Sequence, residues 1–135
     1  MSATFHKTLH KSRQELAVLA KEIEQFLAEH GTSGGATFRV QLALEETILN
    51  LINHSGAAQR IEVRLVLDPD RLVLDIEDDG DYFDPRLVPE FDKKQPLEER
   101  RPGGMGIQLL RSLVSEIDYR RIDSGNRLRL IIPCG

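Results

Sequence analysis

The segment 42–54 is predicted to be a helix with one narrow polar stripe, and this stripe constrains the fold more than any other feature of the chain. The segment contains neither Gly nor Pro, and apolar residues cover most of its circumference. At about 100° per residue, Glu46, Asn50 and Asn53 share one sector. His54 lies near the edge of that sector. Because a solvated helix face is usually broad and buried polar groups need partners, the stripe predicts a site for a ligand or a metal ion.

Size and composition indicate one globular domain, residues 1–135. The chain is long enough for one domain with a core and too short for two ordinary ones. A formal net charge of −4 argues against direct binding of nucleic acid through phosphate neutralisation. Cys134 is the only cysteine, which excludes an intramolecular disulfide and a cysteine-based zinc site.

The sequence also predicts a cytoplasmic protein without a membrane segment. No apolar run approaches the roughly 20 residues that a membrane-spanning helix needs. Residues 1–10 lack the apolar core of a signal peptide.

Periodicity and turn residues predict an α+β fold. Ser12 and Glu15 form a capping box at the start of the first helix, Gly31 is a plausible stop, and Thr37 is a candidate cap for the second helix. The expected helices are 13–30, 37–54 and 107–114, and the expected strands are 3–10, 61–67, 71–77, 116–122 and 127–132. The last four strands form two hairpins. This order fits a two-layer sandwich with a mostly antiparallel, mixed sheet and helices packed on one face.

An acidic turn, 78–85, follows the strand at 71–77. Such turns are often merely solvated. Alternatively, Asp78 faces a pocket and accepts a hydrogen bond from an exocyclic amine such as that of adenine, while Gly80 leaves room for the base.

Residues 103–106 (Gly-Gly-Met-Gly) open the predicted third helix. Backbone amides at a helix N-terminus attract phosphate, and glycine permits a close approach. A flexible loop before a helix is the equally plausible alternative. The preceding proline-containing segment is long enough to be a functional lid, which we place at 86–105.

Taken together, these motifs resemble the GHKL ATPase superfamily, whose members share the Bergerat fold. Glu46 and Asn50 look like the N box of this superfamily. Asp78 and Gly80 look like its first glycine box, and residues 104–106 look like its second glycine box. The chain is similar to one branch of this superfamily, the bacterial anti-sigma factor serine/threonine kinases. The similarity lies in its compact size, in His54 four residues after Asn50, and in the segment 125–128.

The resemblance implies roles for these residues. Glu46 would be the general base, Asn50 would bind Mg²⁺ through its amide oxygen, and Asp78 would read adenine. The expected nucleotide-binding residues, for ATP or ADP, are Asn50, His54, Asp78, Gly80, Gly104, Met105 and Gly106. The implied partners are a sigma factor and an anti-anti-sigma protein of the STAS type, and a homodimer is also expected from the family.

Two alternatives remain open at this point. One is a nucleotide-binding regulator that sequesters a partner without kinase activity, and the other is an interaction domain whose motifs are coincidental. Tyr82 departs from the family pattern, because a second glycine often stands there. Glu45 is a competing candidate for the base, but spacing to Asn50 favours Glu46. Arg100 and Arg101 could neutralise phosphate, although solvated lid charges are the simpler interpretation.

Overall fold

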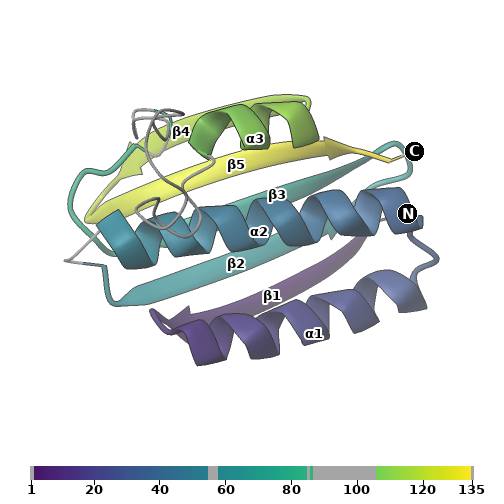
Figure 1. Ribbon diagram of the computed structural model, residues 1–135, viewed down its shortest axis with the longest axis horizontal. Helices are drawn as coiled ribbons and strands as arrows, with labels where there is room; N and C mark the ends of the chain where they lie inside the picture. Colours follow the sequence, from purple (N-terminus) through teal and green to yellow (C-terminus); the bar gives the residue numbers. More distant parts are fainter. Residues whose placement is uncertain (1, 55–57, 85, 87–105, 135) are drawn as a thin grey trace, which may run out of the picture.

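The computed structural model describes residues 2–54, 58–84, 86 and 106–134 and shows five strands and three helices in two layers (Figure 1). The strands are β1 (Ala3–His10), β2 (Arg60–Leu67), β3 (Arg71–Asp78), β4 (Glu116–Ile122) and β5 (Gly125–Pro133). The helices are α1 (Arg13–Glu29), α2 (Gly34–His54) and α3 (Gly106–Leu113). Each predicted element is therefore present, with boundaries shifted by a few residues.

The strands form one sheet in the order β1-β2-β3-β5-β4. All four pairings between described strands are antiparallel, so the sheet is more regular than the mixed sheet we expected. Both predicted hairpins, β2–β3 and β4–β5, are confirmed. Because β5 lies between β3 and β4, the end of β3 is paired with the start of β5, and Asp78 is in register with Asn126.

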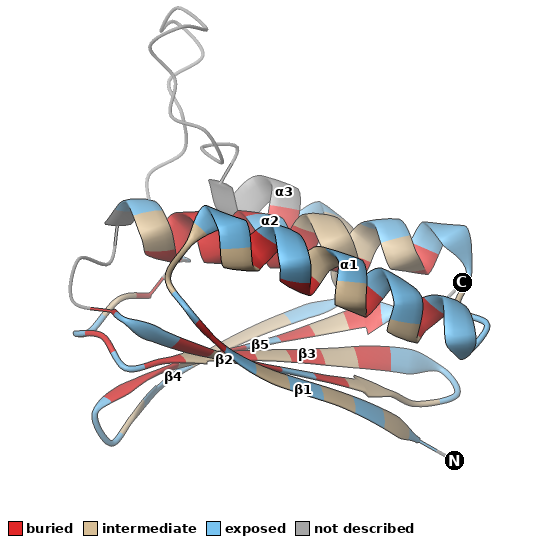
Figure 2. Ribbon diagram, turned by 90° about the horizontal axis from the view of Figure 1, so that it is seen from below, coloured by how far each residue is buried: buried red, intermediate tan, exposed pale blue. Residues whose placement is uncertain are grey.

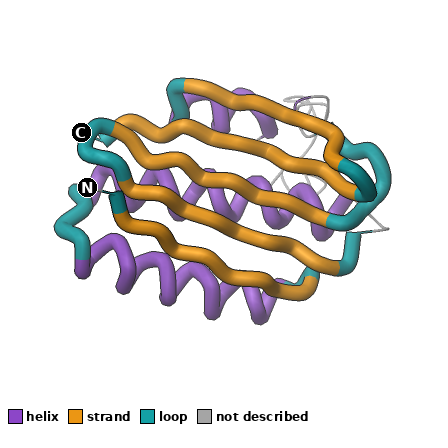
Figure 3. The backbone as a smooth tube through the Cα atoms, turned by 180° about the vertical axis from the view of Figure 1, so that it is seen from behind, coloured by secondary structure: helices purple, strands orange, loops and turns teal. Residues whose placement is uncertain are grey.

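All three helices cover the same face of the sheet (Figure 2), as expected for an α+β sandwich. Alternate strand residues such as Leu128 and Leu130 point into the core between the two layers. Arg129, between them in sequence, lies on the opposite face and pairs with Asp75 across β3 and β5, with Nε 2.7 Å from Oδ1. Figure 3 shows this second face, over which no described helix lies.

The ends of α1 follow the predicted capping signals, with one difference. The Ser12 hydroxyl accepts from the backbone N–H groups of Gln14 and Glu15. Glu15 reaches back to the N–H of His10 at 3.2 Å, two residues before the cap. Gly31, at φ 69°, ends the helix in the left-handed conformation that glycine adopts without strain.

The second helix begins earlier than predicted. Ser33, rather than Thr37, is at its start, because the Ser33 hydroxyl accepts from the N–H of Ala36 at 3.1 Å. The extra turn at Gly34–Ala36 extends α2 to 21 residues. Its C-terminal end lies at the same end of the sheet as the end of β3 and the start of β5, on the left in Figure 1.

Two further predictions concern the lid and the absence of a membrane segment. The proposed lid, 86–105, lies outside the described residues except for Arg86. Among the described helices, none is long and apolar enough to cross a membrane.

Candidate functional site

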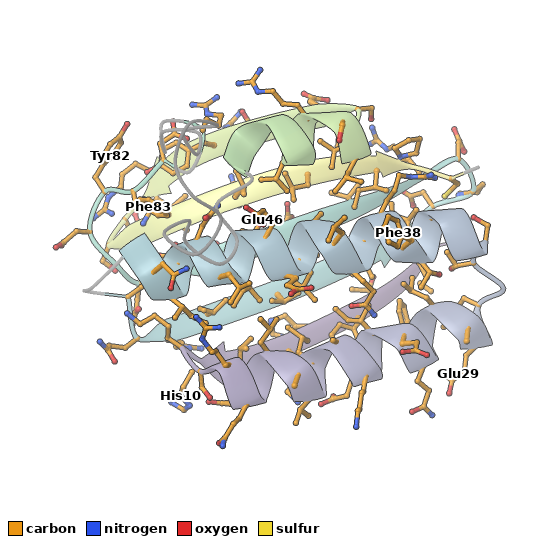
Figure 4. All side chains as sticks on the ribbon, in the orientation of Figure 1. His10, Glu29, Phe38, Glu46, Tyr82 and Phe83 are labelled. Carbon is orange, nitrogen blue, oxygen red and sulfur yellow. The ribbon has the colours of Figure 1, made fainter. Side chains whose placement is uncertain are left out.

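The polar stripe of α2 is buried where it carries Glu46 and Asn50. Their side chains are 5% and 2% exposed, and the neighbouring Glu45 is exposed. Figure 4 shows Glu46 on the side of α2 that faces α3. Asn53 is exposed, and His54 is the last residue of α2. Burial therefore singles out Glu46 and Asn50, one helical turn apart, as the inward-facing polar pair.

Asp78 ends β3 and is also buried, at 8% exposure. Its Oδ1 accepts from the N–H of Gly80 at 2.8 Å and from Nδ2 of Asn126 at 3.0 Å. Burial raises the pKa of Asp78 above its usual value, although both hydrogen bonds act in the opposite direction. The Asp-x-Gly motif thus forms a tight turn in which the aspartate is tied to its own glycine.

Asn126 connects the segment that follows β3 to β5. Its Nδ2 also donates to the carbonyl of Asp81 at 2.8 Å. Its Oδ1 accepts from the N–H of Phe83 at 3.2 Å and from the Tyr119 hydroxyl. Asn126 is 3% exposed. It therefore fixes both the Asp78 carboxylate and the chain that leaves it.

Gly125 is required at its position because of a close backbone approach. A Cβ atom built on it would stand 1.9 Å from the carbonyl oxygen of Asp78. Arg121 secures the same region, since its guanidinium donates to the carbonyl of Gly80 at 2.8 Å. Gly125 and Asn126 were not among the site residues predicted from the sequence, where 125–128 served only as part of the family resemblance. Their signal was the Gly-Asn pair that opens the last strand.

An ion pair between a buried carboxylate and an exposed guanidinium lies beside this network. Asp84 is 6% exposed, and Arg86 binds both of its carboxylate oxygens, at 3.0 and 2.7 Å. Burial alone would raise the pKa of Asp84, but the hydrogen bonds from Arg86 outweigh it and hold the pKa below the usual value. The Arg86 guanidinium also lies 5.7 Å from the ring centre of Tyr119. Tyr82 packs edge-on against the same ring and is 63% exposed.

A small cavity joins α2 to the Asp78 network. Its polar lining residues are Thr47, Asp78, Tyr119 and Asn126, and its apolar ones are Leu51, Ile76, Phe83 and Leu128. The Thr47 hydroxyl has no hydrogen-bond partner among the described residues, although the residue is 2% exposed. Leaving such a group unpaired costs about 1–3 kcal/mol. Polar groups from α2, β3 and β5 therefore converge on one apolar-walled space of about 10 Å³, close to the room that a single water needs.

The remaining candidate residues are less well defined. Gly106 begins α3. Gly104, Met105, Arg100 and Arg101 lie outside the described residues. Within the described part of the chain, no three His, Cys, Asp or Glu side chains are grouped so as to hold a metal ion by themselves.

A family model matches nearly the whole chain. Residues 10–132 match the model of the histidine kinase-like ATPase domain. The chain belongs to this family. That assignment confirms the resemblance of the chain to GHKL ATPases, and it implies ATP as the nucleotide.

Among curated proteins, this ATPase domain is distantly similar to two bacterial kinases. It is 28% identical to the serine/threonine-protein kinase BtrW of Bordetella bronchiseptica over 96 residues, which are 69% of this chain and 68% of BtrW. It is 27% identical to the serine-protein kinase RsbW of Bacillus licheniformis over 93 residues, 64% of this chain and 58% of RsbW.

A solved structure supports the fold. The crystal structure of the RsbU and RsbW domains of a Mycobacterium tuberculosis protein superposes with a TM-score of 0.67 at 18% identity. The superposition covers 98% of this chain and 33% of that one. The two-layer architecture of the described residues is therefore that of an RsbW domain.

Proposed function

We propose that this histidine kinase-like ATPase domain is an ATP-dependent serine/threonine-protein kinase that acts as an anti-sigma factor. It would phosphorylate an anti-anti-sigma antagonist and sequester a sigma factor. The observation that carries the catalytic part is the burial of Glu46 and Asn50 one turn apart on α2. A domain that only bound nucleotide would have no need of a buried carboxylate beside the metal-binding amide.

The adenine end of the site is formed by Asp78. Its Oδ1 is occupied by Gly80 and Asn126, and no donor in the described part of the chain reaches Oδ2. That oxygen is the acceptor for the exocyclic amine of adenine. The turn is fixed before the ligand arrives, so binding requires little reorganisation there.

The phosphate end is formed by Asn50 and the start of α3. The Asn50 amide supplies the hard oxygen ligand that Mg²⁺ prefers, and the nucleotide phosphates and water would supply the others. Bound Mg²⁺ would neutralise charge on the phosphates. Gly104, Met105 and Gly106 would donate backbone N–H groups to the phosphates, His54 would line the same end, and the lid would be residues 86–105.

Glu46 then serves as the general base. It accepts the proton of a serine or threonine hydroxyl while that oxygen bonds to the γ-phosphorus. The bond from the γ-phosphorus to the β–γ bridging oxygen breaks, and ADP leaves. Because the carboxylate lies on a helix packed against the sheet, its position is fixed relative to Asn50.

The proposed partners follow from the similarity to BtrW and RsbW, which are named as protein kinases. The phosphorylated partner would be a STAS-type anti-anti-sigma protein, and the sequestered one a sigma factor. We further propose a cytoplasmic protein without direct contact to nucleic acid, formed of one domain and able to form a homodimer.

Phosphate transfer tests the proposal directly. The purified chain is incubated with γ-labelled ATP, Mg²⁺ and each candidate STAS-type protein, and label is expected on a serine or threonine of one of them. Binding of Mg-ADP with no transfer to any candidate would favour the alternative, a regulator that sequesters a partner without kinase activity. The Asp78–Asn126 network is compatible with that alternative, because it forms the adenine end without Glu46.

Mg-ADP binding tests what both functions share. A ligand that binds only the folded state raises the melting temperature, so millimolar Mg-ADP should stabilise the chain. Asp78→Asn should remove that shift, because the new amide N–H would face the adenine amine. No shift for the parent chain would contradict both functions and leave a domain that does not bind nucleotide.

A further inference from the structure

Thr47 has a buried hydroxyl group that the proposed chemistry does not use. The residue follows Glu46 on α2 and is 2% exposed, and its Oγ1 has no hydrogen-bond partner in the described part of the chain. A threonine in a helix often donates its hydroxyl to the carbonyl four residues earlier. Thr47 makes no such bond, so its hydroxyl is available to a ligand.

Thr47 lines the same small cavity as Asp78, which lies on a different element of the fold. The other walls include the apolar side chains of Leu51, Ile76 and Phe83. Apolar walls with a few convergent polar groups, one of them a carboxylate, suit the edge of a flat heteroaromatic ring and do not suit a phosphate. The enclosed volume is about 10 Å³, room for about one water, so the side chains around it would have to move apart for the edge of a base to reach the hydroxyl.

We propose that Thr47 is a second base-reading residue. Its hydroxyl donates to the ring nitrogen of adenine beside the exocyclic amine, N1 or N7, while Asp78 accepts from the amine itself. This assignment rests on the proposed nucleotide site and adds a specificity-determining residue to it. Adenine presents a donor and a neighbouring acceptor on one edge, and the carboxylate and hydroxyl are complementary to that pair.

Two substitutions at this position separate the hydroxyl from the packing. Thr47→Val keeps the branched shape and removes the hydroxyl, whereas Thr47→Ser keeps the hydroxyl. Calorimetric titration of the full chain with ADP and Mg²⁺ should show affinity about 3- to 10-fold weaker for the valine variant, as expected for one lost neutral hydrogen bond. The serine variant should bind within about twofold of the parent. Without nucleotide, the valine variant should melt no lower than the parent, because it buries no unpaired hydroxyl.

Base analogues identify the hydrogen bond. ADP analogues with carbon in place of N1 or of N7 are titrated against the parent and Thr47→Val. One of the two analogues lacks the nitrogen that Thr47 binds. The parent should bind that analogue more weakly than ADP, by the same factor by which Thr47→Val weakens ADP binding. The valine variant should bind that analogue as tightly as it binds ADP. The 3-deaza analogue is the control. Its affinity relative to ADP should be the same for the parent and for Thr47→Val.

The possible outcomes are distinct. Equal ADP affinity of the parent and Thr47→Val overturns the role of Thr47 and leaves the nucleotide site intact. The valine variant could also bind ADP, the N1 analogue and the N7 analogue more weakly than the parent by the same factor. That result overturns the role of Thr47 too, because the effect would be on packing. If the parent chain binds no ADP at all, the proposed function itself fails, and the role of Thr47 fails with it.

Discussion

Gly125 approaches Asp78 so closely that a Cβ atom on Gly125 would stand 1.9 Å from the Asp78 carbonyl oxygen and 3.0 Å from its carbonyl carbon. The contact lies where the end of β3 meets the start of β5, one residue before the Asp78–Asn126 pair. Both obstructing atoms are backbone atoms, so no side-chain rotation can relieve the overlap. The geometry of the proposed adenine end therefore depends on a residue that itself has no side chain.

Gly125→Ala should disrupt this end of the sheet. Overpacking of this kind costs about 1–3 kcal/mol, and we expect the free energy of unfolding in urea to fall by at least that amount. Mg-ADP should also stabilise the variant less than the parent, because Asp78 would be displaced. Gly34→Ala is the matched control: among the described residues, nothing beyond its own stretch of helix lies within 4 Å of the added Cβ, and the change should be close to neutral. Equal stability of Gly125→Ala and the parent would contradict the close approach.

Asn126→Ala should change the pH dependence of ADP binding. Burial raises the pKa of Asp78, and the hydrogen bond from Asn126 lowers it, so removing Asn126 should raise the pKa further. Because Oδ1 accepts two N–H groups, a proton added to Asp78 resides on Oδ2 and removes the acceptor for adenine. Affinity should fall as the pH drops through this pKa, with the midpoint at higher pH in the variant than in the parent.

The same nucleotide is used for the parent and for Asn126→Ala, so any protonation of ADP itself affects both midpoints equally. Fluorescence or calorimetric titrations from neutral pH to about pH 4 supply the two midpoints. A weaker affinity with an unchanged midpoint would show that Asn126 acts on packing alone. A midpoint shifted to lower pH would contradict the direction of the hydrogen-bond effect.

Local sequence patterns predicted the elements of this fold, but they did not predict the long-range pairing that completes the site. Alternation and turn residues located both hairpins, and the helical period placed Glu46 and Asn50 on an inward face. The contact of Asn126 with Asp78 spans 48 residues and depends on β5 lying between β3 and β4. No hairpin signal specifies that strand order. Thr47 looks like an ordinary core position until the cavity beside it is known.

Loss of Arg86 should destabilise the fold in a pH-dependent way. The pKa of Asp84 is lowered in the folded state, so its ionised form stabilises the fold above the unfolded pKa of about 3.9. That contribution is lost as the pH falls through the lower, folded pKa. Arg86→Met leaves a buried carboxylate without its guanidinium and should cost about 1–3 kcal/mol at pH 7.

Urea unfolding of the parent and Arg86→Met at several pH values measures this effect. The difference in stability should shrink as the pH falls through the pKa of Asp84 in the variant, which burial without Arg86 holds above the unfolded value, because Asp84 is protonated in the variant first. Asp84→Asn combined with Arg86→Met should recover part of the loss, since the buried charge is gone. A difference that stays constant from pH 7 down to about pH 3 would mean that Arg86 acts through its packing on Tyr119.

Glu46→Gln should separate nucleotide binding from phosphate transfer. Glutamine has nearly the same shape but cannot take the hydroxyl proton, so transfer to the antagonist should fall by a factor of about 100 or more. ADP affinity should stay within several-fold of the parent, because Asp78 and Asn50 are unchanged. Glu45→Gln is the control on the neighbouring exposed carboxylate and should transfer phosphate at the parent rate. Transfer by Glu46→Gln at the parent rate would exclude Glu46 as the base, and loss of transfer only in Glu45→Gln would assign that role to Glu45.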